Sequence, residues 1–178
     1  MVDAKLVSEV DGAKDYTTLF RGVKRLVEKR TGKSRAGIML GLAPLGLSPS
    51  GFLGGYFVLG SNAIVLNRDV LHYIQAREPS YHNAYAFHVL LHEYLHTLGW
   101  FREEEVRPMA YELSLDALGA EHPATRIAAA VNPHTEGAEG APEFFKQLVY
   151  PQFGWAPPQR PVIEIVKGFD PDATGYIA

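Results

Sequence analysis

In the segment FHVLLHEYLHTLG, residues 87–99, His92, Glu93 and His96 form the pattern HExxH. On an α-helix the two histidines lie one turn apart on one face, so their imidazoles can converge on a single metal ion. Without a metal, a helix that buried these side chains among leucine, valine and tyrosine would suffer a large loss of hydration. The pattern therefore predicts a metal-binding helix in which Glu93 can reach a metal-bound water, the geometry of a zinc hydrolase.

Composition limits the chemistry that the chain can use. The sequence has 178 residues, of which 47% are hydrophobic and 21% charged, and its formal net charge is −3. These values are typical of a globular protein, and they give no general attraction to nucleic acid or to anionic lipid. Cysteine is absent, which excludes disulfides, thiolate metal sites and cysteine nucleophiles. Any metal must therefore be held by histidine, aspartate, glutamate or water.

Neither a signal peptide nor a membrane span is expected. The first residues, MVDAKLVSE, carry charges where a signal peptide needs an apolar core. The longest apolar stretch, residues 36–47, is too short to cross a bilayer and is interrupted by Pro44 and several glycines. We therefore expect a cytoplasmic protein without membrane or nucleic-acid partners, whose oligomeric state stays open.

Hydrophobic periodicity predicts an α+β fold, in which a small mixed β-sheet packs on helices. Two apolar runs flank Gly60-Ser61-Asn62 and indicate a β-hairpin at residues 56–66. Helices are expected at residues 17–30, 70–76, 81–99, 102–118, 123–131 and 142–150, and further strands at residues 35–42 and 162–166. The HExxH helix is thus followed by a glutamate-bearing helix.

That following helix supplies the candidates for a third metal ligand. Glu105, Glu112 and Asp116 lie on one stripe at the edge of its apolar face, since spacings of four and seven return to nearly the same side of a helix. A zinc site with two protein ligands would be under-coordinated, and this helix must run back past the metal. We select Glu112 as the third ligand, with Glu105 and then Glu103 as rivals. Asp116 is expected to accept a hydrogen bond from a ligand histidine.

With HEYLH at residues 92–96 and ELSLD at residues 112–116, the chain resembles the zincin-class zinc metallopeptidases. More narrowly it is similar to the gluzincins, whose third ligand is a glutamate on a following helix, and its size is similar to that of the compact minigluzincins. The order of elements extends the resemblance over residues 36–120. The third histidine of the metzincin pattern HExxHxxGxxH is replaced by Arg102, which disfavours that subclass.

The resemblance implies a metallopeptidase in which His92, His96 and Glu112 hold Zn²⁺ and Glu93 is the general base. The substrate would be a peptide or an unfolded protein, lying along an edge strand taken as residues 63–66. We assign residues 1–135 to a zincin-like metallopeptidase domain. Residues 136–178 would form a C-terminal helix and an extended tail that packs over the cleft and keeps the enzyme latent.

Several alternatives stay open. The same fold can serve as a non-catalytic zinc-binding regulatory or interaction protein, and the basic residues between 21 and 35 can form a nucleic-acid patch, although such a run is more often a solvated helix face. His88 lies one turn before His92 and is expected as a partly exposed histidine rather than a ligand. The donor that stabilises the oxyanion is not identified by the sequence, which offers Tyr111, Arg107, His88 and His134.

Overall fold

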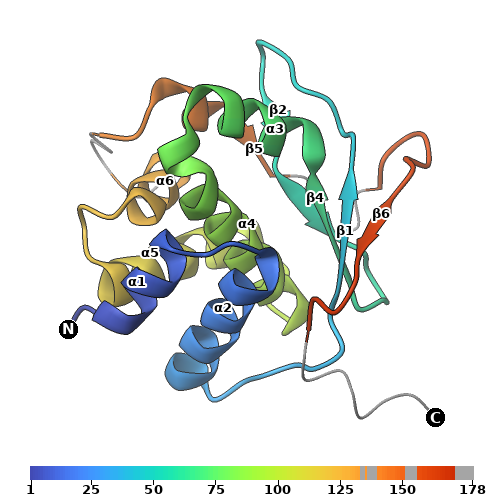
Figure 1. Ribbon diagram of the computed structural model, residues 1–178. Helices are drawn as coiled ribbons and strands as arrows, with labels where there is room; N and C mark the ends of the chain where they lie inside the picture. Colours follow the sequence, from blue (N-terminus) through green and yellow to red (C-terminus); the bar gives the residue numbers. More distant parts are fainter. Residues whose placement is uncertain (133–134, 136–139, 151–155, 171–178) are drawn as a thin grey trace.

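The computed structural model describes residues 1–132, 135, 140–150 and 156–170, and it has the α+β architecture expected from the sequence. Figure 1 shows a helical layer beside a small mixed sheet, with helix α4 (His82–Thr97) between them. The other α-helices are α1 (Ala4–Asp11), α2 (Tyr16–Thr31), α3 (Arg68–Arg77), α5 (Glu103–Leu118) and α6 (Pro123–Val131), and the 3-10 helices are η1 (Pro79–Tyr81) and η2 (Glu143–Gln147).

The main sheet has the strand order β3-β4-β1-β6. Its strands are β1 (Met39–Ala43), β3 (Gly55–Phe57), β4 (Ala63–Asn67) and β6 (Glu164–Val166). Strand β4 forms the expected hairpin with β3 and pairs in parallel with β1, while β6 runs antiparallel to β1. The expectation that residues 63–66 form an edge strand is wrong, because the pairing with β1 places β4 inside the sheet and leaves β3 at the edge.

A second, two-stranded sheet joins distant parts of the chain. Strand β2 (Phe52–Leu53) pairs in parallel with β5 (Leu148–Val149). Residues 142–150 therefore do not form the expected helix: they form the short helix η2 and then an extended strand. The apolar spacing of this segment suits a helix, but backbone pairing with β2 outweighs that local preference.

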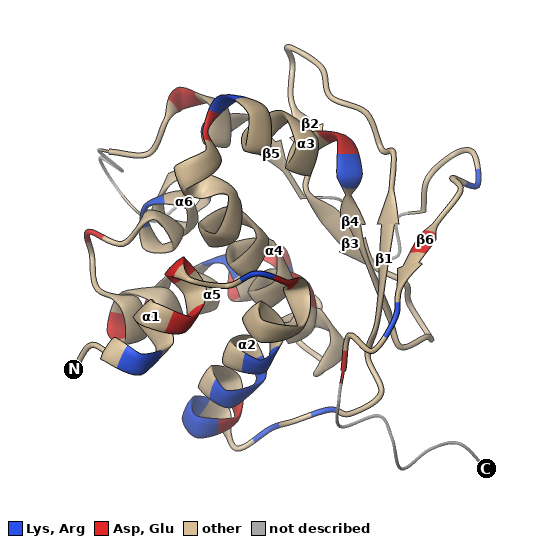
Figure 2. Ribbon diagram, in the orientation of Figure 1, with Lys and Arg blue, Asp and Glu red and all other residues tan. Residues whose placement is uncertain are grey.

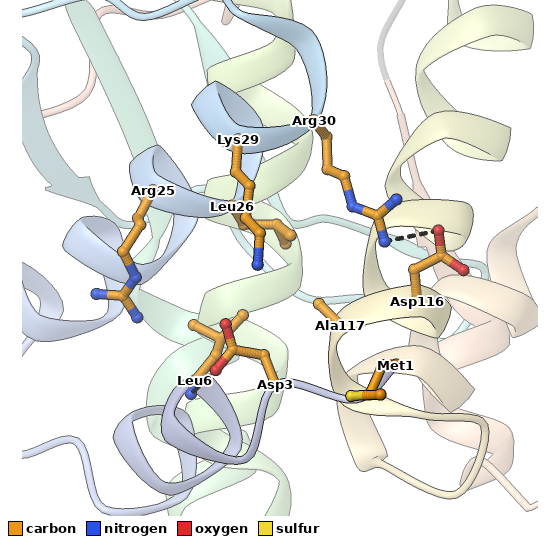
Figure 3. Close-up of a pocket in the computed structure, with 9 residues that line it drawn as sticks. All are labelled: Met1, Asp3, Leu6, Arg25, Leu26, Lys29, Arg30, Asp116 and Ala117. Carbon is orange, nitrogen blue, oxygen red and sulfur yellow. Dashed lines mark hydrogen bonds and ion pairs between the residues drawn. The ribbon is translucent and has the colours of Figure 1, made fainter.

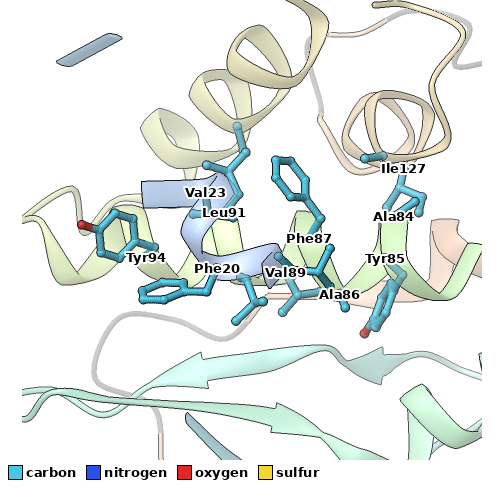
Figure 4. Close-up of a cluster of buried hydrophobic side chains, with 14 of the residues drawn as sticks. Phe20, Val23, Ala84, Tyr85, Ala86, Phe87, Val89, Leu91, Tyr94 and Ile127 are labelled. Carbon is cyan, nitrogen blue, oxygen red and sulfur yellow. The ribbon is translucent and has the colours of Figure 1, made fainter. Parts of the chain in front are cut away.

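Helix α4 is buried along nearly its whole length, since every residue from Ala84 to Thr97 is buried. A helix that is buried on all sides needs neighbours on all sides, and α4 contacts α2, α5 and α6 as well as strands β3 and β4. Figure 4 shows Phe20 and Val23 of α2 close to Phe87, Leu91 and Tyr94 of α4. This packing fixes the direction in which the histidines of α4 point.

The last described segment closes the far edge of the sheet rather than covering α4. Phe169 stacks on Phe20 with ring centroids 4.4 Å apart. Asp170 is buried, bonds to the Lys24 ammonium at 3.1 Å and accepts the backbone N–H of Ile38 at 3.1 Å. Phe169 and Asp170 are therefore buried in the folded core. Of the expected C-terminal segment 136–178, residues 136–139, 151–155 and 171–178 lie outside the described residues.

The basic face of α2 is largely engaged in ion pairs. Lys24 pairs with Asp170, Arg25 with Glu9 and Arg30 with Asp116. Figure 2 shows this cationic side of α2, and Figure 3 shows Arg25, Lys29 and Arg30 around a pocket that also contains the carboxylates of Asp3 and Asp116. Much of the positive charge is thus balanced within the protein. Among the described residues, no helix combines the length and apolar character needed to cross a membrane.

Candidate metal site

Two elements bring three ligand side chains together. Helix α4 presents His92 and His96 on one face, as the HExxH spacing predicts, and a short turn then leads into α5, whose first residue is Glu103. The Nε2 atoms of the two histidines are 3.2 Å apart. Oxygen Oε1 of Glu103 lies 3.3 Å from Nε2 of His92 and 3.1 Å from Nε2 of His96. These three residues form a group that can hold a metal ion.

The third member of the group corrects the sequence prediction. Glu112 is exposed and is absent from the group, while its lower-ranked rival Glu103 is present. Nine residues of α-helix correspond to about 2.5 turns and about 13 Å, so Glu112 lies far along α5 on nearly the opposite face. Asp116 does not approach a ligand histidine either, since it pairs with Arg30 at 2.8 Å. The prediction failed because the turn after α4 is so short that α5 starts at the level of the histidines.

The hydrogen bond of His96 suits a metal ligand. Its Nδ1–H donates to the backbone carbonyl of Trp100 at 2.8 Å, which leaves the lone pair on Nε2 facing the group. The Nδ1 atom of His92 is buried and has no hydrogen-bond partner among the described residues. Two imidazole nitrogens and a carboxylate oxygen therefore converge on one point, an arrangement that either a proton or a cation must stabilise.

The pKa values reflect this crowding. Burial lowers the pKa of His92 to about 4, although the hydrogen bond with Glu103 opposes the shift. Burial also acts to lower the pKa of His96, but the hydrogen bond with Glu103 and the charge of Glu93 outweigh it and raise that pKa. For Glu103, burial acts to raise the pKa, while the hydrogen bonds with both histidines prevail and hold it well below its usual range. The carboxylate of Glu103 is thus the anionic member of the group.

Glu93 lies beside this group rather than in it. It is only 2% exposed, and burial raises the pKa of its carboxyl to about 7, with the charges of His96 and Glu103 acting in opposite directions. The backbone N–H of Phe57, on edge strand β3, donates to Glu93 and lowers that pKa somewhat. A carboxyl group poised near neutrality next to a metal site is suited to accept and return a proton.

Tyr150 is a site residue that the sequence analysis missed. Its ring stacks on the imidazole of His92, with centroids 3.8 Å apart and an angle of 18° between the planes. Its hydroxyl lies 2.6 Å from Nε2 of His88, and the guanidinium of Arg107 lies over its ring at 4.9 Å. Arg107 also bonds to Glu103, with Nε 3.1 Å from Oε2. No local pattern marks Tyr150, because β5 reaches the site only through its pairing with β2.

The other expected donors have different positions. His88 is 1% exposed rather than partly exposed, and burial lowers its pKa to about 3, so its imidazole is neutral. Tyr111 is half-buried on α5, and His134 lies outside the described residues. Of the four donors that the sequence offers, His88 contacts Tyr150, and Arg107 contacts both Tyr150 and Glu103.

The site is closed in this conformation. His92 has no exposed surface, and His96 is 8% exposed. Tyr150 covers one face of His92, and access is left mainly from the side of Glu103, which is half-buried.

Comparisons with protein-family models, with curated proteins and with solved structures found no match for this chain.

Proposed function

We propose that the chain is a zinc-dependent metallopeptidase that hydrolyses peptide bonds in peptides or unfolded proteins. The observation that carries the proposal is the triangle formed by Nε2 of His92, Nε2 of His96 and Oε1 of Glu103, whose sides are 3.2, 3.3 and 3.1 Å. In a tetrahedral zinc site with ligand distances of 2.0–2.1 Å, two donors are separated by about 3.3 Å. Two imidazoles and a carboxylate are also a donor set that suits zinc, with one position left for water.

The residues around the triangle would have different roles in the reaction. When bound, a zinc ion lowers the pKa of water and polarises a peptide carbonyl. Glu93 would accept the proton of the attacking water and deliver it to the leaving amine, which its pKa of about 7 favours. Arg107 would keep the Glu103 carboxylate in place through the bond from its Nε.

An extended substrate would lie along strand β3. The N–H of Val58 donates to Ala63 and the N–H of Asn67 donates to Gly54, so the even-numbered residues of this strand face β4. The backbone groups of Gly55 and Phe57 consequently point away from the sheet, and Phe57 already bonds to Glu93. A peptide paired there would pass directly beside the general base.

The closed conformation is the basis for proposing latency. Tyr150 covers His92, so the enzyme would need this side chain displaced before substrate reaches the ligands. The contact that would keep the enzyme latent is thus assigned to Tyr150, which lies within the C-terminal residues 136–178 that were expected to cover the cleft.

Hydrolysis of a labelled unfolded protein tests the proposal. The zinc-loaded Tyr150→Ala protein should cut it faster than the wild type, and addition of Glu93→Gln should abolish cutting while about one zinc ion per chain is retained. Glu112→Gln is the matched control, since it removes an exposed carboxylate of α5 outside the metal-binding group. Cutting that survives Glu93→Gln would eliminate the general-base role.

A non-catalytic zinc protein of the same fold is the second candidate, favoured by the complete burial of His92. It predicts that zinc binds with the same three ligands but that neither the wild type nor the Tyr150→Ala protein cuts any substrate. The same experiment therefore separates the two functions.

A further inference from the structure

Residues 148–150 lie on the protein in the manner of a bound peptide. Leu148 and Val149 pair in parallel with Phe52 and Leu53 of β2. Their exposure alternates, with Leu148 7%, Val149 51% and Tyr150 8% exposed, so the first and third side chains point inward. Peptides that add a strand to a sheet edge bind in this way: backbone pairing supplies affinity, and pockets for alternate side chains supply specificity.

Two glycines shape the surface that receives this segment. A Cβ atom on Gly54 would lie 2.8 Å from Cδ1 of Leu148 and 2.9 Å from the hydroxyl of Tyr85. A Cβ atom on Gly51 would lie 2.9 Å from Cγ2 of Val149. Side chains at these positions would collide with the segment, so the chain on both sides of β2 is suited to close approach by another backbone.

The neighbours of Tyr150 contact each part of its side chain. One ring face stacks on His92 at 3.8 Å between centroids, and the guanidinium of Arg107 lies 4.9 Å from the ring centre. The hydroxyl bonds to Nε2 of His88 at 2.6 Å. A stacking surface, a cation and a hydrogen-bonding partner at the end of the ring together distinguish a phenol from an aliphatic side chain.

The hydroxyl contact also distinguishes tyrosine from phenylalanine. His88 is 1% exposed, and its other ring nitrogen has no hydrogen-bond partner among the described residues. With phenylalanine in the pocket, the buried imidazole would lose its bond to the hydroxyl without gaining water. The hydroxyl of Tyr85 is also buried and has no hydrogen-bond partner in the described part of the chain. It adds a polar atom near Leu148, since both side chains lie close to Gly54. A site built to bond a hydroxyl rejects the analogue that lacks it.

We propose that the surface along β2 and over His92 is a binding site for extended peptide segments in which an aliphatic residue is followed two positions later by tyrosine. Leu148-Val149-Tyr150 occupies this site as an internal copy of the ligand. The inference rests on the proposed function only in naming such segments as substrates, because binding at the pocket does not require hydrolysis.

Peptide binding to a protein with a weakened internal copy tests the inference. The variant Leu148→Ala/Tyr150→Ala, combined with Glu93→Gln to prevent cutting, is titrated with the labelled peptide acetyl-Gln-Leu-Val-Tyr-amide and with its phenylalanine analogue. The tyrosine peptide should bind about tenfold more tightly than the analogue, and addition of His88→Leu should abolish this preference. Leucine is chosen because its volume is similar to that of histidine.

A milder variant covers the case in which the multiple variant does not fold. Tyr150→Phe removes only the hydroxyl of the internal copy, so the tyrosine peptide should bind about tenfold more tightly to this variant than to the wild type. Equal binding of the tyrosine and phenylalanine peptides to the multiple variant would overturn the inference. No binding of the tyrosine peptide to folded Tyr150→Phe protein would also overturn it, and Tyr150 would then be a permanent structural part of the site.

Hydrolysis is measured separately, with Glu93 intact and zinc bound. Tyrosine-selective binding without hydrolysis by the Leu148→Ala/Tyr150→Ala protein would leave the peptide site in place and contradict the peptidase. Hydrolysis without tyrosine preference would support the peptidase and contradict the tyrosine-selective peptide site.

Discussion

Replacing Glu103 by glutamine removes the anionic member of the metal-binding group while nearly keeping its shape. Its carboxylate oxygens lie within 3.1–3.3 Å of both ligand histidines, and Oε2 also bonds to Arg107. Loss of a residue that merely orients a ligand lowers metal affinity 10- to 100-fold, so loss of a charged ligand should lower zinc affinity by at least about 100-fold, or about 2.7 kcal/mol. Glu112→Gln should change it less than about twofold, because Glu112 is exposed and lies about 13 Å further along α5.

The assay is a zinc titration against a chelating dye of known affinity, on metal-free protein at neutral pH. NMR titration of the histidines supplies an independent measurement: the hydrogen bond with Glu103 helps to raise the pKa of His96, so Glu103→Gln should lower that pKa in the metal-free protein. If Glu103→Gln retains zinc while Glu112→Gln loses it, the geometric assignment of the third ligand is refuted.

Three further outcomes follow from the contacts around the site. Arg107→Met should lower zinc affinity about tenfold in the same titration, because the bond that orients Glu103 is lost; unchanged affinity would mean that Arg107 does not position the ligand. The pKa of His88 is lowered from 6.5 to about 3, so its stabilising contribution is complete above pH 6.5 and is lost as the pH falls toward 3. His88→Leu should therefore make the unfolding free energy of metal-free protein depend less on pH, by up to about 1.4 kcal/mol per pH unit. Urea titrations between pH 4 and 7 measure this slope, and an unchanged slope would contradict a neutral buried imidazole. Lys24→Met leaves the buried Asp170 carboxylate without its ammonium partner and should destabilise the fold by about 3 kcal/mol in urea, whereas a loss below about 1 kcal/mol would show that the pair is solvated.

The sequence was sufficient for features that depend on local periodicity. The apolar run around His92 and His96 predicted a buried helix with both imidazoles on one face, and Gly60-Ser61-Asn62 predicted the hairpin that carries β3. Both features depend on residues close together in the chain, where helical phase and turn chemistry are readable.

The sequence was insufficient where the outcome depends on how elements meet. Glu103 and Glu112 are both glutamates of α5, and only the length of the turn after α4 decides which one reaches the histidines. Tyr150 reaches His92 because β5 pairs with β2, nearly a hundred residues earlier in the chain. No periodic pattern encodes such a pairing, and the apolar spacing of residues 142–150 suggested a helix instead.

Anomalous scattering at the zinc edge from crystals of zinc-loaded protein tests the metal centre most directly. The account predicts one strong peak within about 2.0–2.2 Å of Nε2 of His92, Nε2 of His96 and a carboxylate oxygen of Glu103. A peak coordinated by Glu112 or Glu105 in place of Glu103, or no peak at these histidines, would contradict it.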